Sequence, residues 1–170
     1  IIREDIETSY KEKLREAYSS LNNLVLKKDV KKSDIVEHEN YTKELLKYII
    51  TDLNEFRMLH GDKTLGGMIV CETSEQARKM FVLFNEVQDD INRSADKKSN
   101  LKAALILHDS DDKETREKYI DDFKKAKSID ILIVFNMLLT GFDAPRLKKL
   151  YLGRKLKDHS LLQAITRVNR

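Results

Sequence analysis

DILIVFNMLLTGFDAP, residues 130–145, joins an apolar run to an abrupt turn, and this pairing decides the fold. The apolar residues 129–139 predict a buried strand followed by a short connection. In the turn, Gly141 permits a sharp bend or the close approach of a ligand, and Pro145, the only proline in the chain, stiffens the exit. We expect Asp143 where the carboxyl end of a strand opens into a crevice, the usual ligand position in open α/β sheets.

The same alternation of apolar runs and helical periods extends outward from this stretch. Predicted strands cover residues 67–71, 103–107, 131–135 and 150–152. Thr73, with Gln76 as its reciprocal partner, is expected to cap a helix. The predicted core face of that helix consists of Ala77, Met80, Phe81, Phe84 and Val87. A further helix is predicted over 112–126, and Ser160 can cap the last one. Strands that alternate with amphipathic helices predict an α/β fold, with a parallel sheet flanked by helices.

The first 62 residues differ in kind from the rest. Helices are predicted over 5–28 and 34–59, and the second has an apolar stripe of Leu45, Ile49, Leu53 and Phe56. Gly61 is expected to end this helix. The sequence therefore divides into a helical extension or connection, residues 1–62, and an α/β unit, residues 63–170.

The last eight residues, QAITRVNR (163–170), suit an anionic ligand. In a helix Gln163, Arg167 and Arg170 share one face. The apolar stripe of the same helix, Leu161, Ile165 and Val168, lies roughly 200° away. Two guanidinium groups on a braced helix fit phosphate. The alternative is an ordinary solvated charged face.

TGFDAP (140–145) and QAITRVNR together resemble motifs V and VI of superfamily-two helicases and translocases. The resemblance is closest to the second motor lobe of the restriction (R) subunit of type I restriction–modification enzymes, and it is strong over residues 103–170. GGMIVCETSEQARKMFVLF (66–84) resembles the motif IV strand and helix more weakly. The resemblance implies that residues 63–170 form a RecA-like lobe, of the P-loop NTPase type, that is truncated at motif VI.

The R subunits that this chain resembles use ATP to pump double-stranded DNA past a fixed complex and then cut it. Two RecA-like lobes hold the ATP between them. The resemblance implies catalytic roles for Arg170, as the arginine finger, and for its neighbour Arg167. It implies nucleotide contacts for Gln163, Gly141 and Asp143, the last two near the ribose, and a DNA contact for Thr140. An arginine finger can be worth about 10³ to 10⁵ in rate.

Three further residues are DNA-binding candidates. Thr73 and Ser74 begin a helix, whose free N–H groups suit a DNA phosphate, although an ordinary helix cap explains them equally well. His108 follows a strand and is expected to be a loop contact near DNA. The resemblance implies as partners double-stranded DNA, the first motor lobe and nuclease domain of the same subunit, and the methylation and specificity subunits.

The chain lacks a complete phosphate-binding G-x-x-x-x-G-K-[ST] loop. ATP and Mg²⁺ are therefore expected to be bound mainly by the first lobe, and we expect no bound cofactor in the isolated chain. We predict part of an ATP-hydrolysing type I site-specific deoxyribonuclease that is inactive by itself. The four histidines and Cys71 show no metal-ligand spacing, so no metal site is predicted.

Composition sets broad limits. The chain is 41% hydrophobic and 36% charged, with a net charge of only +3, which does not by itself identify a nucleic-acid partner. There is no apolar run of membrane-spanning length, and a single cysteine fits a reducing, cytoplasmic location. The chain starts with Ile and stops within a motif, so we expect a piece of a longer protein.

Two other functions remain open. An isolated helicase-like lobe could be a non-catalytic module that binds DNA or protein. The lobe could also belong to another superfamily-two motor, such as a repair or remodelling ATPase. An upstream phosphate-binding loop would favour a motor, and neighbouring specificity and methylation genes would favour the restriction system.

Overall fold

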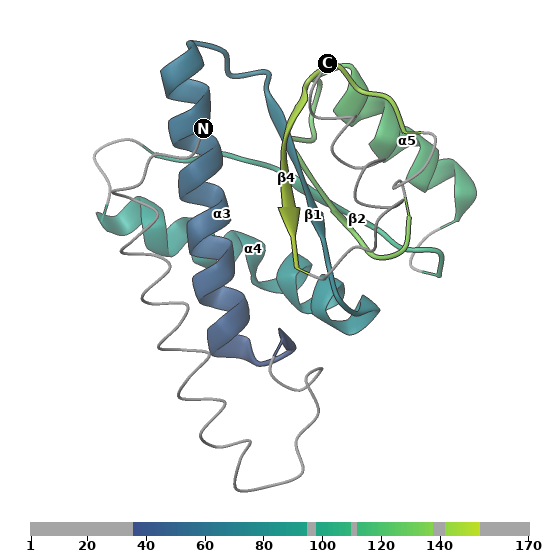
Figure 1. Ribbon diagram of the computed structural model, residues 1–170, viewed down its shortest axis with the longest axis horizontal. Coiled ribbons are helices and arrows are strands. Elements are labelled where there is room, and N and C mark those ends of the chain that lie inside the picture. The colour runs from purple at the N-terminus through teal and green to yellow at the C-terminus, as the bar shows by residue number, and fades with distance from the viewer. Residues whose placement is uncertain (1–35, 95–97, 110–111, 138–141, 154–170) are drawn as a thin grey trace, which may run out of the picture.

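The structure is a computed structural model that describes residues 36–94, 98–109, 112–137 and 142–153 (Figure 1). Helices and strands alternate along the chain, as the sequence predicts. The elements are α3 (Glu39–His60), β1 (Gly66–Val70), α4 (Ser74–Ser94), β2 (Ala103–Ile106), α5 (Lys113–Lys124), β3 (Ile131–Val134) and β4 (Leu147–Leu152).

The four strands form one sheet in the order β2-β3-β1-β4. Every neighbouring pair is parallel, with Gly67 opposite Ile131 and Ala104 opposite Leu132. The predicted α/β fold with a parallel sheet is confirmed. β4 begins at Leu147 rather than at residue 150, although the lysines at 148 and 149 interrupt the apolar run. Its pairing with β1 shifts register there, with Gly66 opposite Leu147 and Gly67 opposite Lys149.

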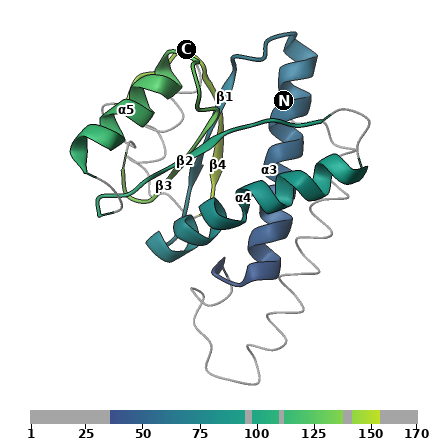
Figure 2. The same ribbon diagram turned by 180° about the vertical axis from the view of Figure 1, so that it is seen from behind.

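Helices cover both faces of the sheet. α3 and α4 lie on one face and α5 on the other (Figures 1 and 2). Successive side chains of β1 point to opposite faces of the sheet and so pack into different cores. Ile69 packs on the α3–α4 side, and Met68 and Val70 pack on the α5 side. All four residues of β3 are buried for the same reason.

α3 is an integral part of this core. Its fully buried residues are Leu46, Ile49, Ile50 and Leu53. Burial of each such side chain contributes about 1.5–3 kcal/mol, so the four together contribute roughly 6–12 kcal/mol, as much as the whole stability of a typical domain. The core therefore continues across the division predicted between residues 62 and 63. Helix 5–28 lies outside the described residues.

The helix ends follow local sequence signals. Gly61 adopts the left-handed conformation (φ 62°) and ends α3, which confirms the predicted stop. Asp112 caps α5 by accepting a hydrogen bond from the Thr115 N–H. The prediction that Phe81 is a core residue of α4 is wrong, since its side chain is 42% exposed. Ala77, Met80, Phe84 and Val87 define the buried face, and position 81 lies roughly 80° from its centre.

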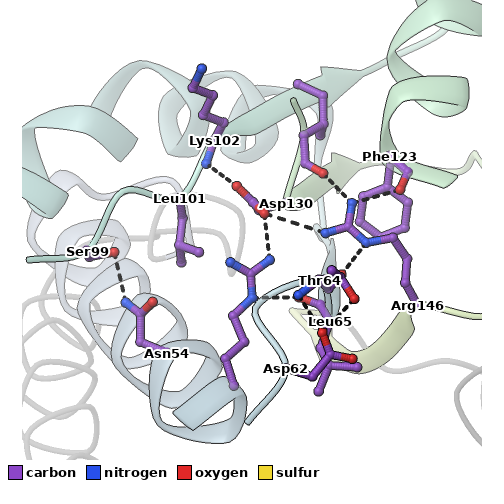
Figure 3. A network of polar contacts seen from close by, with 12 residues as sticks. Asn54, Asp62, Thr64, Leu65, Ser99, Leu101, Lys102, Phe123, Asp130 and Arg146 are labelled. Atoms are coloured by element: carbon purple, nitrogen blue, oxygen red, sulfur yellow. Dashed lines mark hydrogen bonds and ion pairs between the residues drawn. The ribbon is translucent and has the colours of Figure 1, made fainter. Parts of the chain in front are cut away.

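A polar network at the amino edge of the sheet ties together the segments that precede all four strands (Figure 3). Asp130, just before β3, accepts from the Arg57 guanidinium at 2.6 Å and from the Lys102 backbone N–H, just before β2, at 2.9 Å. Arg146, just before β4, donates to the Thr64 carbonyl, just before β1. Arg146 also donates to the carbonyls of Phe123 and Ile129, both at 2.7 Å. This network fixes the strands' starting points and so the loops at their far ends.

Candidate functional site

The opposite, carboxyl edge of the sheet gathers several of the predicted DNA-binding residues. Because the strands are parallel, the loops after β1, β2 and β3 leave from this edge, toward which the arrowhead of β4 points in Figure 1. Two backbone bonds join the strand ends there: the Cys71 N–H donates to the Val134 carbonyl at 2.9 Å, and the Gly153 N–H donates to the Val70 carbonyl at 2.8 Å. Thr73, Ser74 and His108 therefore lie at one edge.

Thr73 caps α4, as predicted. Its hydroxyl accepts from the Gln76 N–H at 3.0 Å and donates to the Glu37 carboxylate at 2.6 Å. The Gln76 side chain accepts from the N–H of Glu72, at 2.8 Å, which is one residue before Thr73, the predicted reciprocal partner. Both hydrogen-bonding roles of the Thr73 hydroxyl are thus taken, and a carboxylate faces it. A phosphate that bound the Thr73 hydroxyl would therefore have to displace Glu37, whereas Ser74, like Thr73, is half-buried.

His108 is exposed on the loop after β2. Neighbouring helices hold this loop from both sides. The His108 carbonyl accepts from the Arg116 guanidinium of α5 at 2.9 Å, and the carboxylate of Asp109 pairs with Arg78 of α4, also at 2.9 Å. The backbone is therefore fixed while the imidazole faces solvent, which is the arrangement that a loop contact to DNA requires.

Asn136, at the end of β3, has a left-handed backbone with φ 53°. Asparagine adopts this conformation more readily than most residues. Its side chain is exposed, and the residue lies shortly before the predicted motif V turn.

Asp143 lies in the described segment that leads into β4. Its neighbour Phe142 is buried with its ring centre 6.0 Å from that of Phe123, near the last turn of α5. Leu147, four residues later, already pairs with Gly66 at the amino edge. Asp143 itself is exposed, and its predicted place in a ligand crevice stays a prediction.

The remaining predicted site residues lie outside the described residues. They are Thr140, Gly141, Gln163, Arg167 and Arg170. The convergence of Asp143 with the two arginines therefore stays a prediction, as do the catalytic roles.

Reasoning from the sequence alone missed a second polar cluster, which is half-buried between α3 and β4. The Asp52 carboxylate accepts from the Tyr151 hydroxyl at 2.7 Å and pairs with the Lys149 ammonium at 2.9 Å. Burial, and secondly the negative charge of Asp52, raise the pKa of Tyr151 well above its usual range. Lys149 lies close to the motif V turn in sequence, where a basic residue could contact DNA. In the structure its ammonium group is instead paired with the Asp52 carboxylate.

Cys71 is a core residue, as predicted. Its thiol is fully buried and 3.7 Å from the Met80 sulfur, and burial raises its pKa to about 12. In the described ranges, no group of three or more His, Cys, Asp or Glu side chains could hold a metal ion. Among the described helices, none has the length and apolar character needed to cross a membrane.

Comparison with known proteins decides the family. The family described as Type I restriction enzyme subunit R domain 3 (T1R_D3-like) matches residues 108–170. The MjaVIIIP type I restriction enzyme endonuclease subunit of Methanocaldococcus jannaschii is 32% identical over 166 residues, which cover 83% of this chain. The chain belongs to the R-subunit family of type I restriction enzymes. The resemblance inferred from motifs V and VI is confirmed.

Two further similarities define which part of an R subunit this is. The type I restriction enzyme HindI endonuclease subunit of Haemophilus influenzae is 41% identical over 64 residues, 38% of this chain and 6% of that protein. A fragment of an HsdR subunit of a type I restriction enzyme from Vibrio vulnificus shares the fold, with a TM-score of 0.50 and 20% identity over 76% of this chain and 24% of that one. The chain spans only 15% of the length of the M. jannaschii relative. It therefore corresponds to a part of an R subunit.

Proposed function

We propose that this chain is part of the second motor lobe of an ATP-driven translocase of double-stranded DNA within a type I restriction endonuclease. The observation that carries the proposal is the family match over residues 108–170, because this stretch contains both TGFDAP and QAITRVNR. The parallel sheet supports it, since RecA-like lobes are built on such sheets and bind ligands beyond their strand ends.

In this proposal ATP and Mg²⁺ are held mainly by the first lobe, and the second lobe completes the cleft. Arg170 stabilises charge on the transferred γ-phosphoryl group, and Arg167 binds the neighbouring phosphates. Gln163 orients the site, and Gly141 and Asp143 approach the ribose. Asp143 fits this role in being exposed. Hydrolysis removes the contacts that close the cleft and lets the lobes separate.

DNA contacts are proposed at the carboxyl edge, through Ser74, Thr73, His108 and Thr140. The first turn of α4 offers N–H groups to a phosphate, and His108 presents an exposed ring nearby. Contacts of this kind position the duplex without reading its sequence, so binding should be sequence-tolerant and weaken with salt. Recognition of a particular site would belong to the specificity subunit, and methylation to its own subunit.

The test uses the complete R subunit assembled with its methylation and specificity subunits. Arg170→Ala and, separately, Arg167→Ala should abolish DNA-stimulated ATP hydrolysis and translocation while leaving the fold intact. Arg93→Ala is the matched control, because Arg93 is an exposed arginine near the end of α4 that pairs with Asp90 of the same helix. Near-normal hydrolysis by Arg170→Ala would remove the role assigned to it.

A second candidate function is a non-catalytic DNA- or protein-binding module, and the exposed His108 on a loop held by Arg116 and Arg78 would serve such a module equally well. On the motor proposal, the isolated chain hydrolyses no ATP, but the complete subunit does so when DNA is added. A complete subunit that binds DNA without DNA-stimulated phosphate release would favour the binding module.

A further inference from the structure

The segment from Val36 to Leu65, which contains α3, contacts α4 in its first half and the sheet in its second half (Figure 2). At its start, Glu37 accepts from the Thr73 hydroxyl at 2.6 Å through its carboxylate and from the Lys79 ammonium at 2.9 Å through its carbonyl. In its first turns, Lys43 pairs with Glu86 of α4 at 2.9 Å. The N-terminal half of α3 is therefore joined to α4 by side chains as well as by core packing.

The second half of α3 is joined to the other elements of the sheet. Asp52 binds Lys149 and Tyr151 of β4, while Asn54 donates to the Ser99 hydroxyl at 2.8 Å, just before β2. Arg57 then pairs with Asp130 before β3. Between these contacts the aliphatic face of α3 is fully buried. Separating α3 from the sheet would break every one of these contacts at once.

The turn between α3 and β1, residues 61–65, has the composition of a flexible joint but is braced from both sides. The Asp62 N–H donates to the Arg57 carbonyl at 3.1 Å, and the Thr64 N–H donates to the Asp62 carboxylate at 2.7 Å. Arg57 holds the Leu65 carbonyl at 2.6 Å, and Arg146 holds that of Thr64. The Gly61 N–H also donates to the Met58 carbonyl. Every residue from 61 to 65 except Lys63 therefore takes part in at least one of these hydrogen bonds. This turn is fixed in place rather than free to pivot.

We propose that residues 36–65 move as one rigid body with the sheet during the motor's ATP cycle, and that the pivot between the two lobes lies outside this segment. The inference rests on the proposed motor function, because it concerns the motion of one lobe against the other. Of the two alternatives predicted for residues 1–62, a helical extension or a connection, it assigns α3 to an extension that moves with this lobe.

A reversible cross-link between α3 and α4 tests the inference. In the complete R subunit, in a background without other reactive thiols, Lys43→Cys and Glu86→Cys replace a solvent-accessible ion pair with two thiols. A reducible bifunctional thiol reagent then joins them, and Cys71 stays unmodified because it is buried. Lys43→Cys alone, treated with the same reagent, is the matched control for modification without a tether.

We expect the cross-linked subunit and the same subunit after reduction to have rates in a ratio of about one, for both DNA-stimulated ATP hydrolysis and translocation. A tether between two parts of one rigid body disfavours none of the conformations in the cycle. A loss of either rate that reduction reverses, and that the single-cysteine control does not show, would overturn the inference. If the untethered subunit shows no DNA-stimulated hydrolysis, the motor proposal itself fails.

Amide hydrogen exchange keeps the inference testable in that case, because it reads the fold rather than the activity. We expect the amides of Leu46 to Leu53 to be as strongly protected as those of β1, with and without a non-hydrolysable ATP analogue. Exchange of α3 that is faster than that of β1 in either state would show that α3 detaches, and would refute the rigid-body assignment.

Discussion

Arg57 and Asp130 form an ion pair of 2.6 Å that joins the last turn of α3 to the residue before β3, 73 positions later in the chain. Arg146 approaches the same carboxylate oxygen at 3.5 Å. Both guanidinium groups are almost fully buried, so one carboxylate serves two enclosed cations. Burial lowers the pKa of Arg146, and the charge of Asp130 opposes that shift. Asp130 is thus the residue on which the network depends.

We expect Asp130→Asn to lower the free energy of unfolding by about 2–3 kcal/mol, because it leaves two buried guanidinium groups without a counter-charge. Urea unfolding of the chain measures the change. Asp121→Asn is the control: Asp121 pairs with Lys125 on the surface, and its loss should matter little. Equal effects of the two substitutions would contradict the assigned importance of Asp130.

Gly66 and Gly67, adjacent in β1, should respond differently to alanine. A Cβ on Gly66 would lie 2.7 Å from two ring atoms of Phe123 and 3.2 Å from the Asp130 carbonyl, whereas one on Gly67 would meet the Tyr151 ring at 3.2 Å. Phe123 is fully buried and cannot move aside freely. Gly66→Ala should therefore cost about 1–3 kcal/mol and Gly67→Ala less. Thermal unfolding of both variants gives the comparison, and a reversed order would contradict the packing described.

Local signals in the sequence were sufficient for the strands and helix ends, and insufficient for contacts between distant residues. The buried runs of β1 and β3 and the stop at Gly61 depend on neighbouring residues, so periodicity and glycine placement predicted them. The ion pairs of Asp130 and Asp52 connect residues that only the folded sheet brings together. The burial of Phe142 in the core on the α5 side is likewise a contact between residues distant in sequence.

Cys71 should be unreactive in the folded chain. Its thiol is fully buried, and a pKa raised to about 12 leaves almost no thiolate near neutral pH. Labelling with a chromogenic disulfide reagent should therefore be slow in buffer and rapid in denaturant. Fast labelling of the native chain would show that the end of β1 opens.

Tyr151 should make the stability depend on pH in alkaline solution. The fold raises the pKa of its phenol above the ordinary value of 10.0, so the folded state retains a proton that the unfolded chain releases. Its contribution is complete below that value and declines as the pH rises above it. Tyr151→Phe should be less stable near neutral pH, through loss of the bond to Asp52, but should lose less stability above about pH 10. If the free energy of unfolding of the original chain and of Tyr151→Phe changed with pH in parallel across that range, the raised pKa of Tyr151 would be contradicted.

The central claim is that this lobe supplies an arginine finger to a nucleotide bound by another part of the subunit. Single-turnover ATP hydrolysis by the complete, DNA-bound subunit with Arg170→Ala tests it most directly, because this rate isolates chemistry from product release. We predict a fall of about 10³ or more relative to the unsubstituted subunit, with ATP binding largely retained. A single-turnover rate within about tenfold of the original would mean that Arg170 stabilises no transition-state charge, and would contradict the motor-lobe account.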